Sequence, residues 1–302
     1  MLYHETKLGK LFKGDCLEVM DELIRDKVKV DAIICDLPYQ ITKCAWDILI
    51  PFNKHILTTK GRSKKLIPMY EDEWIIRECE TTNKTIHQCR DEFQEKCIEG
   101  MWDKLNKLIK NDGTIALFGS EPFSSALRMS NIKNYKYDWI WEKSKPVGFA
   151  NAKKMPLKNL ETISVFYSSL PTYNPQGLKK CDRTINNSTK VKKQNNITAI
   201  NGGAFKTNTY KQEFTNYPRQ ILKYSIEQGL HKTQKPVELM KYIIKTYTNE
   251  GELVLDFTSG SGTTAVASEE LNRRWICIEK DEDSEGSSLG YLDITVERLN
   301  EL

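Results

Sequence analysis

The sequence predicts an α/β protein built on a mainly parallel sheet, and two observations support this prediction. Short apolar runs at 30–35, 114–118, 252–256 and 273–278 have the length and composition of buried strands. Helical patterns lie beside them, and each run ends abruptly in polar, glycine or proline residues. Strands that alternate with helices in this way are typical of a sheet covered on both faces.

Spacing and turn residues predict the elements of the N-terminal half. Apolar side chains at 17, 20, 23 and 24 predict a helix before the strand at 30–35. Residues 101–109 predict an amphipathic helix that stops at Asn111-Asp112-Gly113, because glycine commonly follows the last turn of a helix. The other segments are a polar stretch at 53–99, helical from about 71 to 97, and strands at 114–118, 137–141 and 162–167.

The C-terminal half begins with a polar segment, 168–230, which has no helical period and resembles an irregular β module. An amphipathic helix is expected at 237–247. The clearest unit follows, with a strand at 252–256, a glycine turn at 258–262, a helix at 263–271 and a strand at 273–278.

The composition is that of an ordinary globular protein. Of the 302 residues, 39% are hydrophobic and 28% are charged, which excludes collagen-like and disordered chains. No apolar run approaches the ~18 to 20 residues of a membrane helix. The N-terminal residues lack the pattern of a secretory signal. We therefore expect a cytoplasmic protein with no membrane partner.

The eight cysteines contain no C-x-x-C pair. This spacing predicts reduced thiols rather than a disulfide framework or a zinc site. A metal site formed by Cys79, Cys89, Cys97 and His87 is the less favoured alternative, because the segment lacks the paired spacing of a zinc ribbon or finger.

The net charge of +4 conceals a strong asymmetry. Between Lys133 and Lys235 there are 19 Lys or Arg against 6 Asp or Glu, a local excess of +13, so the remainder carries −9. The same segment contains 13 of the 29 aromatic residues. Cations that meet phosphates and rings that stack on bases are typical of nucleic-acid binding. On charge alone, a solvated face of an ordinary domain is an equal alternative.

A glycine loop indicates a site for a nucleoside. The run Asp256-Phe257-Thr258-Ser259-Gly260-Ser261-Gly262-Thr263-Thr264 follows a predicted strand and opens a helix, and Glu279 ends the next strand. An acid at that place accepts hydrogen bonds from ribose hydroxyls in dinucleotide-binding folds. Ala265 replaces the third glycine of the dinucleotide pattern, so the loop suits a nucleoside without a pyrophosphate, such as S-adenosyl-methionine. A plain strand-to-helix turn is the alternative.

A second turn, Asp36-Leu37-Pro38-Tyr39, ends the strand at 30–35 on the edge where ligands of parallel sheets bind. The Asp36 carboxylate and a backbone carbonyl can accept hydrogen bonds from an exocyclic amine, and Tyr39 can stack on the attached ring. Holding the amine in this way favours a tetrahedral nitrogen that can attack a sulfonium methyl group. Alone, such a sequence is usually a simple turn. Together with the glycine loop, it is interpreted as the catalytic turn.

These motifs, in this order, resemble the amino-group DNA methyltransferases of adenine-N6 type, in the class β arrangement and in a variant common among phage and prophage enzymes. Asp36-Leu37-Pro38-Tyr39 stands where the family has Asp-Pro-Pro-Tyr, and leucine keeps the carbonyl but loosens the turn. The other matching segments are Gly14-Asp15, 118–123, 151–157, His231-Lys232-Thr233-Gln234-Lys235-Pro236 and the loop 256–264 followed by Glu279.

The resemblance implies a circularly permuted Rossmann-like sheet of the S-adenosyl-methionine-dependent methyltransferases, with an inserted recognition domain. Residues 1–167 and 231–302 would form the catalytic and cofactor-binding domain, and 168–230 the target recognition domain. The segment 53–99 is an insertion without a family counterpart. This segment could serve in dimerisation or in contact with DNA. A solvated helical excursion without such a role is the favoured interpretation.

The implied reaction moves a methyl group from S-adenosyl-methionine, without a metal, to the N6 amine of a flipped adenine in double-stranded DNA. Cytosine-N4 methylation is the alternative, and Asp rather than Ser at position 36 favours adenine. Methylation of RNA or protein amines and a non-catalytic DNA-binding remnant are further alternatives. The sequence leaves open a homodimer and a restriction endonuclease partner.

The resemblance also implies roles for single residues. In catalysis, Asp36 and the Leu37 carbonyl would orient the amine, Pro38 would stiffen the turn and Tyr39 would stack on the base. Asp15 would lie at the adenine of the cofactor, and Lys235 and Pro236 at its methionine end. The remaining cofactor-binding residues would be Asp256, Phe257, Thr258, Gly260, Gly262, Thr263 and Glu279.

Overall fold

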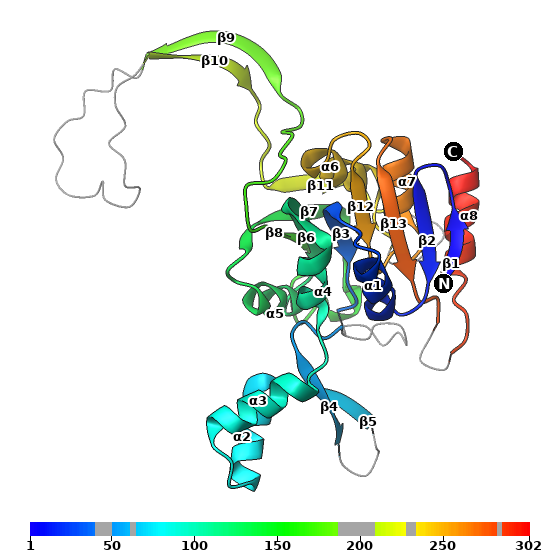
Figure 1. Ribbon diagram of the computed structural model, residues 1–302. Helices are drawn as coiled ribbons and strands as arrows, with labels where there is room; N and C mark the ends of the chain where they lie inside the picture. Colours follow the sequence, from blue (N-terminus) through cyan, green and yellow to red (C-terminus); the bar gives the residue numbers. More distant parts are fainter. Residues whose placement is uncertain (40–49, 61–64, 187–208, 228–233, 283–285) are drawn as a thin grey trace, which may run out of the picture. The chain divides into compact units, whose positions relative to one another are not determined.

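The structure is a computed structural model that describes residues 1–39, 50–60, 65–186, 209–227, 234–282 and 286–302. Its centre is a nine-stranded sheet in the order β1-β2-β13-β12-β3-β6-β8-β7-β11 (Figure 1). The strands are β1 (Leu2–Glu5), β2 (Gly9–Lys13), β3 (Val30–Asp36), β6 (Ile109–Gly119), β7 (Tyr135–Val147), β8 (Lys158–Phe166), β11 (Ile221–Tyr224), β12 (Leu253–Asp256) and β13 (Arg274–Glu279).

The five strands from β2 to β6 in this order are parallel to one another, as are β7 and β11. Strand β8 is antiparallel to both its neighbours, and β1 is antiparallel to β2. The prediction of a mainly parallel sheet is therefore confirmed. Strand β3 lies between β12 and β6, so the N-terminal and C-terminal parts of the chain meet at the middle of the sheet.

Helices cover both faces of this sheet (Figure 1). Helices α1 (Cys16–Arg25), α4 (Met101–Leu108) and α5 (Phe123–Ser130) pack on one face. Helices α6 (Val237–Tyr247), α7 (Thr263–Glu270) and α8 (Tyr291–Asn300) pack on the other. Successive side chains of a strand point to opposite faces, so Ile33 of β3 joins the first cluster and Ile34 joins the second. Burial on both faces explains why 30–35 is a nearly continuous apolar run.

Position 113 departs from the prediction. The helix α4 ends at Leu108, and β6 begins at Ile109 and continues through Gly113, where a turn was expected. A Cβ atom on Gly113 would lie 2.6 Å from the Ile109 side chain and 2.9 Å from the Asp31 carbonyl. Glycine is therefore required here by the close approach of β6 to β3, not by the end of a helix.

The segment expected to be a helical insertion begins with two strands. An antiparallel hairpin of β4 (His55–Lys60) and β5 (Lys65–Tyr70) precedes α2 (Glu71–Thr81) and α3 (Ile86–Lys96). The two helices confirm the prediction for 71–97, whereas the hairpin was not predicted. Four buried side chains form a separate small core, namely Trp74, Ile75, Cys89 and Phe93.

Residues Pro175–Arg219 form a second compact unit, which lies within the range expected for target recognition. It contains the antiparallel strands β9 (Lys179–Asn186) and β10 (Thr209–Thr215). The unit holds nine Lys or Arg against two Asp or Glu. Residues 187–208 lie outside the described part of the chain.

The two residues that flank this unit, Asn174 and Gln220, belong to the main unit and are hydrogen-bonded within it. The backbone N–H of Asn174 donates to the Thr246 carbonyl (2.7 Å), and its side-chain amide donates to the carbonyls of Lys245 and Thr248 at the end of α6. At the other junction, the Gln220 carbonyl accepts a hydrogen bond from the Ile140 N–H (2.8 Å), and β11 then pairs with β7.

Helix α6 is fixed to β7 by a buried hydroxyl group. The Tyr247 hydroxyl accepts a hydrogen bond from Trp139 Nε1 (2.7 Å) and shares another with the Tyr137 hydroxyl (2.8 Å). Trp139 and Tyr247 are almost completely buried.

Among the described residues, no helix is both long enough and apolar enough to span a membrane.

We predict that Tyr247→Phe lowers the free energy of unfolding by about 1–3 kcal/mol, because it leaves the buried Trp139 indole N–H without its acceptor. Urea denaturation followed by tryptophan fluorescence measures the change. Tyr173→Phe is the matched control, since the Tyr173 side chain is 45% exposed. Equal stability of Tyr247→Phe and the wild type would contradict the prediction.

Candidate active site

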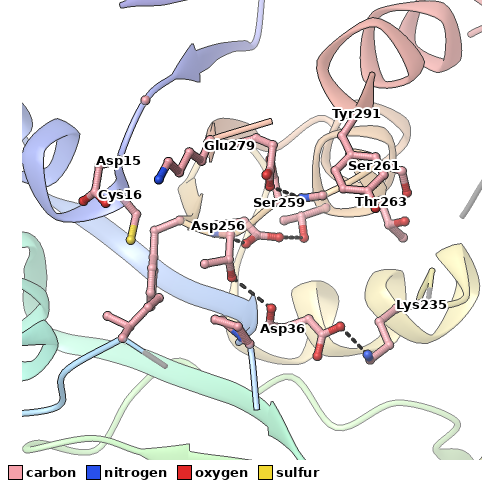
Figure 2. Close-up of a pocket in the computed structure, with 18 of the residues that line it drawn as sticks. Asp15, Cys16, Asp36, Lys235, Asp256, Ser259, Ser261, Thr263, Glu279 and Tyr291 are labelled. Atoms are coloured by element: carbon pink, nitrogen blue, oxygen red, sulfur yellow. Dashed lines mark hydrogen bonds and ion pairs between the residues drawn. The ribbon is translucent and has the colours of Figure 1, made fainter. Parts of the chain in front are cut away.

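A pocket of about 510 Å³ lies at the carboxyl edge of the parallel strands (Figure 2). Three adjacent strands, β13, β12 and β3, end in the acidic residues Glu279, Asp256 and Asp36, and all three line the pocket. Ligands of open α/β sheets bind at this edge, and the volume is typical of a site for a cofactor-sized molecule. The sheet therefore brings together the two motifs that the sequence singled out.

The buried carboxylate of Asp256 organises the glycine loop. It accepts hydrogen bonds from the Cys35 thiol (2.9 Å), the Thr258 backbone N–H (3.1 Å) and the Thr264 hydroxyl. Burial raises the pKa of Asp256 to about 6, although these hydrogen bonds act in the opposite direction. The Cys35 thiol also accepts a hydrogen bond from the Phe257 N–H (3.2 Å), so it joins β3 to the loop.

Different structural constraints act on the two glycines of the loop. Both have positive φ angles, 51° at Gly260 and 75° at Gly262. A Cβ atom on Gly262 would lie 2.3 Å from the Thr295 side chain, so this glycine allows α8 to approach the start of α7. Gly260 lines the pocket instead, and its N–H donates to Glu279 Oε2 (2.7 Å).

Both carboxylate oxygens of Glu279 accept hydrogen bonds from backbone N–H groups beside the loop. Oε2 accepts from Gly260 and Oε1 accepts from the Asp281 N–H (3.1 Å). Burial raises the pKa of Glu279, and nearby Asp256 adds to this effect. Each carboxylate oxygen has two lone pairs, so the group can accept further hydrogen bonds from a ligand.

The catalytic turn is tied to the same loop. The Asp36 carbonyl accepts a hydrogen bond from the Thr258 hydroxyl (2.9 Å), and the Asp36 carboxylate accepts from the Tyr39 hydroxyl. The ring of Tyr39 packs on Phe123 with centroids 4.9 Å apart. Leu37 is 4% exposed and packs in the core with α1 and α4. Burial of this side chain holds the turn in place where the family pattern has proline.

Lys235 lies almost completely buried beside Asp36 (Figure 2). Its ammonium group forms an ion pair with Asp36 Oδ2 and lies 3.5 Å from Glu161 Oε2. Burial alone would lower the pKa of Lys235, but the charges of Asp36 and Glu161 outweigh it and raise the pKa above its usual value. The group is therefore a cation at neutral pH. Glu161 in turn pairs with Lys143.

The structure gathers most of the predicted residues around the pocket. Gly14 and Asp15 also line the pocket. The Asp15 carboxylate caps α1 by accepting a hydrogen bond from the Leu17 N–H (2.9 Å). The predicted residues that line the pocket are Asp15, Asp36, Pro38, Lys235, Asp256, Phe257, Thr258, Gly260, Thr263 and Glu279. Leu37, Pro236 and Gly262 are buried behind this lining, and Tyr39 lies beside Asp36.

Several residues at the site were not predicted from the sequence. Gln234 lines the pocket, and its Nε2 donates to Glu227 (3.2 Å), whereas its buried Oε1 has no hydrogen-bond partner among the described residues. Gln234 belonged to a recognised motif, so proximity to Lys235 could have indicated it. Cys35 was predicted only as a small buried hydrophobe. Glu161 had no sequence signal, because its two partners, Lys143 and Lys235, come from two other segments.

The cysteine segment shows no metal-binding geometry. Cys79 Sγ donates to Cys89 Sγ at 3.3 Å, and these two thiols belong to the small core of α2 and α3. Within the described parts of the chain, no three His, Cys, Asp or Glu side chains come together as a metal site.

Comparison with known proteins identifies the class. The family model of the N6 and N4 methylases, described as DNA methylase, matches residues 30–286, and the chain therefore belongs to this family of DNA methylases. The Type II methyltransferase M.HindIII of Haemophilus influenzae is 25% identical over 320 residues, which cover 94% of this chain and 95% of the relative. M.BamHI of Bacillus amyloliquefaciens is 26% identical over 309 residues, covering 98% of this chain and 58% of the relative.

The fold is also shared with a solved structure. The M1.HpyAVI–SAM complex has a TM-score of 0.54 and 20% identity to this chain, with coverage of 97% of this chain and all of that one. Since β3 carries the catalytic turn and precedes the cofactor-loop strand β12 in the chain, the sheet has the permuted order that was predicted.

We predict that Asp256→Asn changes the pH dependence of stability. The pKa of Asp256 is about 6 in the folded protein, against an ordinary value of 3.8, so the folded state binds the extra proton between about pH 4 and 6. Stability from this residue is lost as the pH rises through that window. From pH 4 to 7, the variant should therefore gain up to about 3 kcal/mol relative to the wild type.

Urea denaturation at pH values from 4 to 7 measures this difference. Asparagine keeps the oxygen that accepts from Cys35 and Thr258, and the exchange of the other oxygen for an amide beside the Thr264 hydroxyl adds an offset that does not vary with pH, so the slope against pH reports the ionisation. Asp112→Asn, at an exposed position, is the control. A constant difference between Asp256→Asn and the wild type across the range would show that Asp256 titrates normally.

Proposed function

We propose that this protein transfers a methyl group from S-adenosyl-methionine to the N6 amine of adenine in double-stranded DNA. Membership of the DNA methylase family gives the class of reaction. The observation that carries the proposal is the shared edge of β3, β12 and β13, which places Asp36 in the same pocket as the glycine loop and Glu279.

The residues present fit this cofactor. Glu279 ends β13, where its remaining lone pairs can accept from ribose hydroxyls, and Asp15 and Cys16, which follow the neighbouring strand β2, line the pocket beside it (Figure 2). Gln234 Oε1, which has no hydrogen-bond partner in the part of the chain that the structure describes, offers an acceptor for a cationic amino group. When bound, the cofactor supplies an electrophilic methyl group on a sulfonium centre.

The chain's own residues would prepare the amine. Asp36 and the Leu37 carbonyl accept its two N–H groups, which draws the nitrogen lone pair out of conjugation with the ring. Pro38 stiffens the turn, and Tyr39 stacks on the base after its hydroxyl leaves the Asp36 carboxylate. The reaction then depends chiefly on positioning and on fixed charge. The target base has to leave the duplex, because its amine is otherwise paired.

The basic unit 175–219, within the range 168–230, is proposed to read the DNA. Its nine cations against two anions favour contact with phosphates. Any restriction endonuclease partner and any dimer stay outside this proposal.

Aspartate rather than serine at position 36 favours adenine over cytosine as the target base, because the turn at 36–39 resembles that of the adenine-N6 enzymes. The matched family includes both N6 and N4 enzymes, and cytosine N4 would use the same acceptors. Mass spectrometry of nucleosides from methylated DNA distinguishes the two, since N6-methyladenine and N4-methylcytosine differ in mass.

We predict that Asp36→Ala lowers methyl transfer to duplex DNA by at least about a thousandfold, because the amine loses its charged acceptor. Labelled cofactor and genomic DNA of mixed sequence measure the transfer. Calorimetry should show that cofactor binding changes little, since Asp36 is not placed at the nucleoside. Equal activity of the variant and the wild type, or no methylated base with the wild type, would refute the proposal.

We predict that replacing Lys190, Lys192 and Lys193 with glutamine weakens DNA binding and reduces the slope of log affinity against log salt. Each lost phosphate contact should reduce the slope by about 0.9. These lysines lie outside the described residues, and the prediction rests on the charge of the segment. Replacing Lys7, Lys10 and Lys29 of the main unit is the control. Identical slopes for the two triple variants would contradict the placement of the DNA-reading segment.

A further inference from the structure

Four charged side chains form a row of alternating sign behind the pocket. Lys143 pairs with Glu161, Glu161 faces Lys235, and Lys235 pairs with Asp36. Their side chains are 14%, 13%, 7% and 26% exposed, respectively. They come from β7, β8, the segment before α6 and the end of β3.

The surroundings of the row are apolar. The Phe118 ring of β6 lies 5.4 Å from the Lys235 ammonium, and the Trp141 ring lies 4.9 Å from that of Lys143. Removing charges from water is costly, and apolar residues of similar size would often stabilise such a site equally well. The presence of a buried glutamate on β8 is therefore not explained by stability alone.

The contacts of Glu161 are unequal. Its Oε1 is in tight contact with Lys143, whereas its Oε2 is buried, lies 3.5 Å from Lys235 Nζ and has no hydrogen bond among the described residues. A separation of 3.5 Å is at the outer limit of a hydrogen bond. Glu161 Oε2 is thus already an ion-pair partner of Lys235, at a separation that allows a closer contact.

The Asp36 carboxylate differs from that of Glu161 in its hydrogen bonds. Both of its carboxylate oxygens are engaged, one by the Tyr39 hydroxyl and the other by Lys235. A cation that belonged to Asp36 alone would compete with an incoming amine for this carboxylate. A cation that can move to another carboxylate would release it.

We propose that Glu161 is a positioning residue, and that the Lys235 ammonium moves closer to Glu161 Oε2 when the target amine takes its place on Asp36. This inference rests on the proposed function, because it concerns the same amine-binding carboxylate. No bond is made or broken in this step except hydrogen bonds. Lys143 balances the charge of Glu161, so that the row stays neutral while Lys235 moves.

The test compares Glu161→Gln with two controls. Glutamine keeps the shape of the side chain and one acceptor, but it removes the charge that attracts Lys235. Glu142→Gln, on the neighbouring strand β7, removes a carboxylate that pairs with exposed Lys223. We expect the single-turnover rate of methyl transfer by Glu161→Gln to fall by about 10- to 100-fold, the usual cost of a misplaced reacting group. The affinity for the cofactor should change by less than about threefold, and Glu142→Gln should resemble the wild type.

The pH profile separates a charge effect from a structural one. Lys235 faces Asp36, Glu161 and the rings of Tyr39 and Phe118, with Lys143 beyond Glu161. In Glu161→Gln, Lys235 keeps one carboxylate and faces an uncompensated Lys143. Its pKa falls, and the alkaline loss of activity should move to lower pH by about one unit or more. Glu161→Asp, which keeps the charge, should restore the wild-type profile.

Lys143→Gln gives the opposing change. It disturbs the same pair of strands, but it removes a positive charge near Lys235, so its activity should persist to at least the wild-type alkaline pH. Similar alkaline shifts in Glu161→Gln and Lys143→Gln would show a merely structural role and overturn the inference. Unchanged rates in Glu161→Gln would do the same. In either case, activity of the wild type on DNA would leave the proposed function intact, whereas an inactive wild type would refute the proposed function itself.

Discussion

A single buried carboxylate, that of Asp256, joins the elements that form the site. It accepts from the Cys35 thiol of β3, from an amide of its own loop and from the Thr264 hydroxyl at the start of α7. Without it, these donors would lose an acceptor in an apolar interior, which is costly. The Thr258 hydroxyl adds a second connection by donating to the Asp36 carbonyl. The proposed catalytic turn and the glycine loop are therefore positioned by one network.

This network spans a long stretch of chain. Cys35 and Asp256 are separated by 221 positions in sequence, yet β3 and β12 are neighbours in the sheet. The chemistry needs only that both strands end at the same edge. The order in which the two halves occur along the chain is thus immaterial to the pocket, and a permuted sheet brings the same side chains together as an unpermuted one.

The parts of the fold that follow from local sequence were predictable. The apolar run at 30–35 predicts a buried strand, because a strand covered on both faces needs apolar residues throughout. The glycine loop at 256–264 predicts the strand before it and the helix after it. Position 113 was misread, because its glycine is required by a neighbouring strand that only the folded sheet brings close. Glu161 and the hydrogen bonds of Cys35 were missed for the same reason. Their roles depend on partners that are distant in the chain.

The two residues that flank the 175–219 unit have an implication for how such enzymes diversify. Asn174 is fastened to the end of α6, and Gln220 leads directly into a strand of the main sheet. The described residues that line the pocket all lie outside the segment between them. We therefore expect that insertions, deletions or exchange of the proposed DNA-reading unit would change the sequence that is read and leave the described pocket lining unchanged.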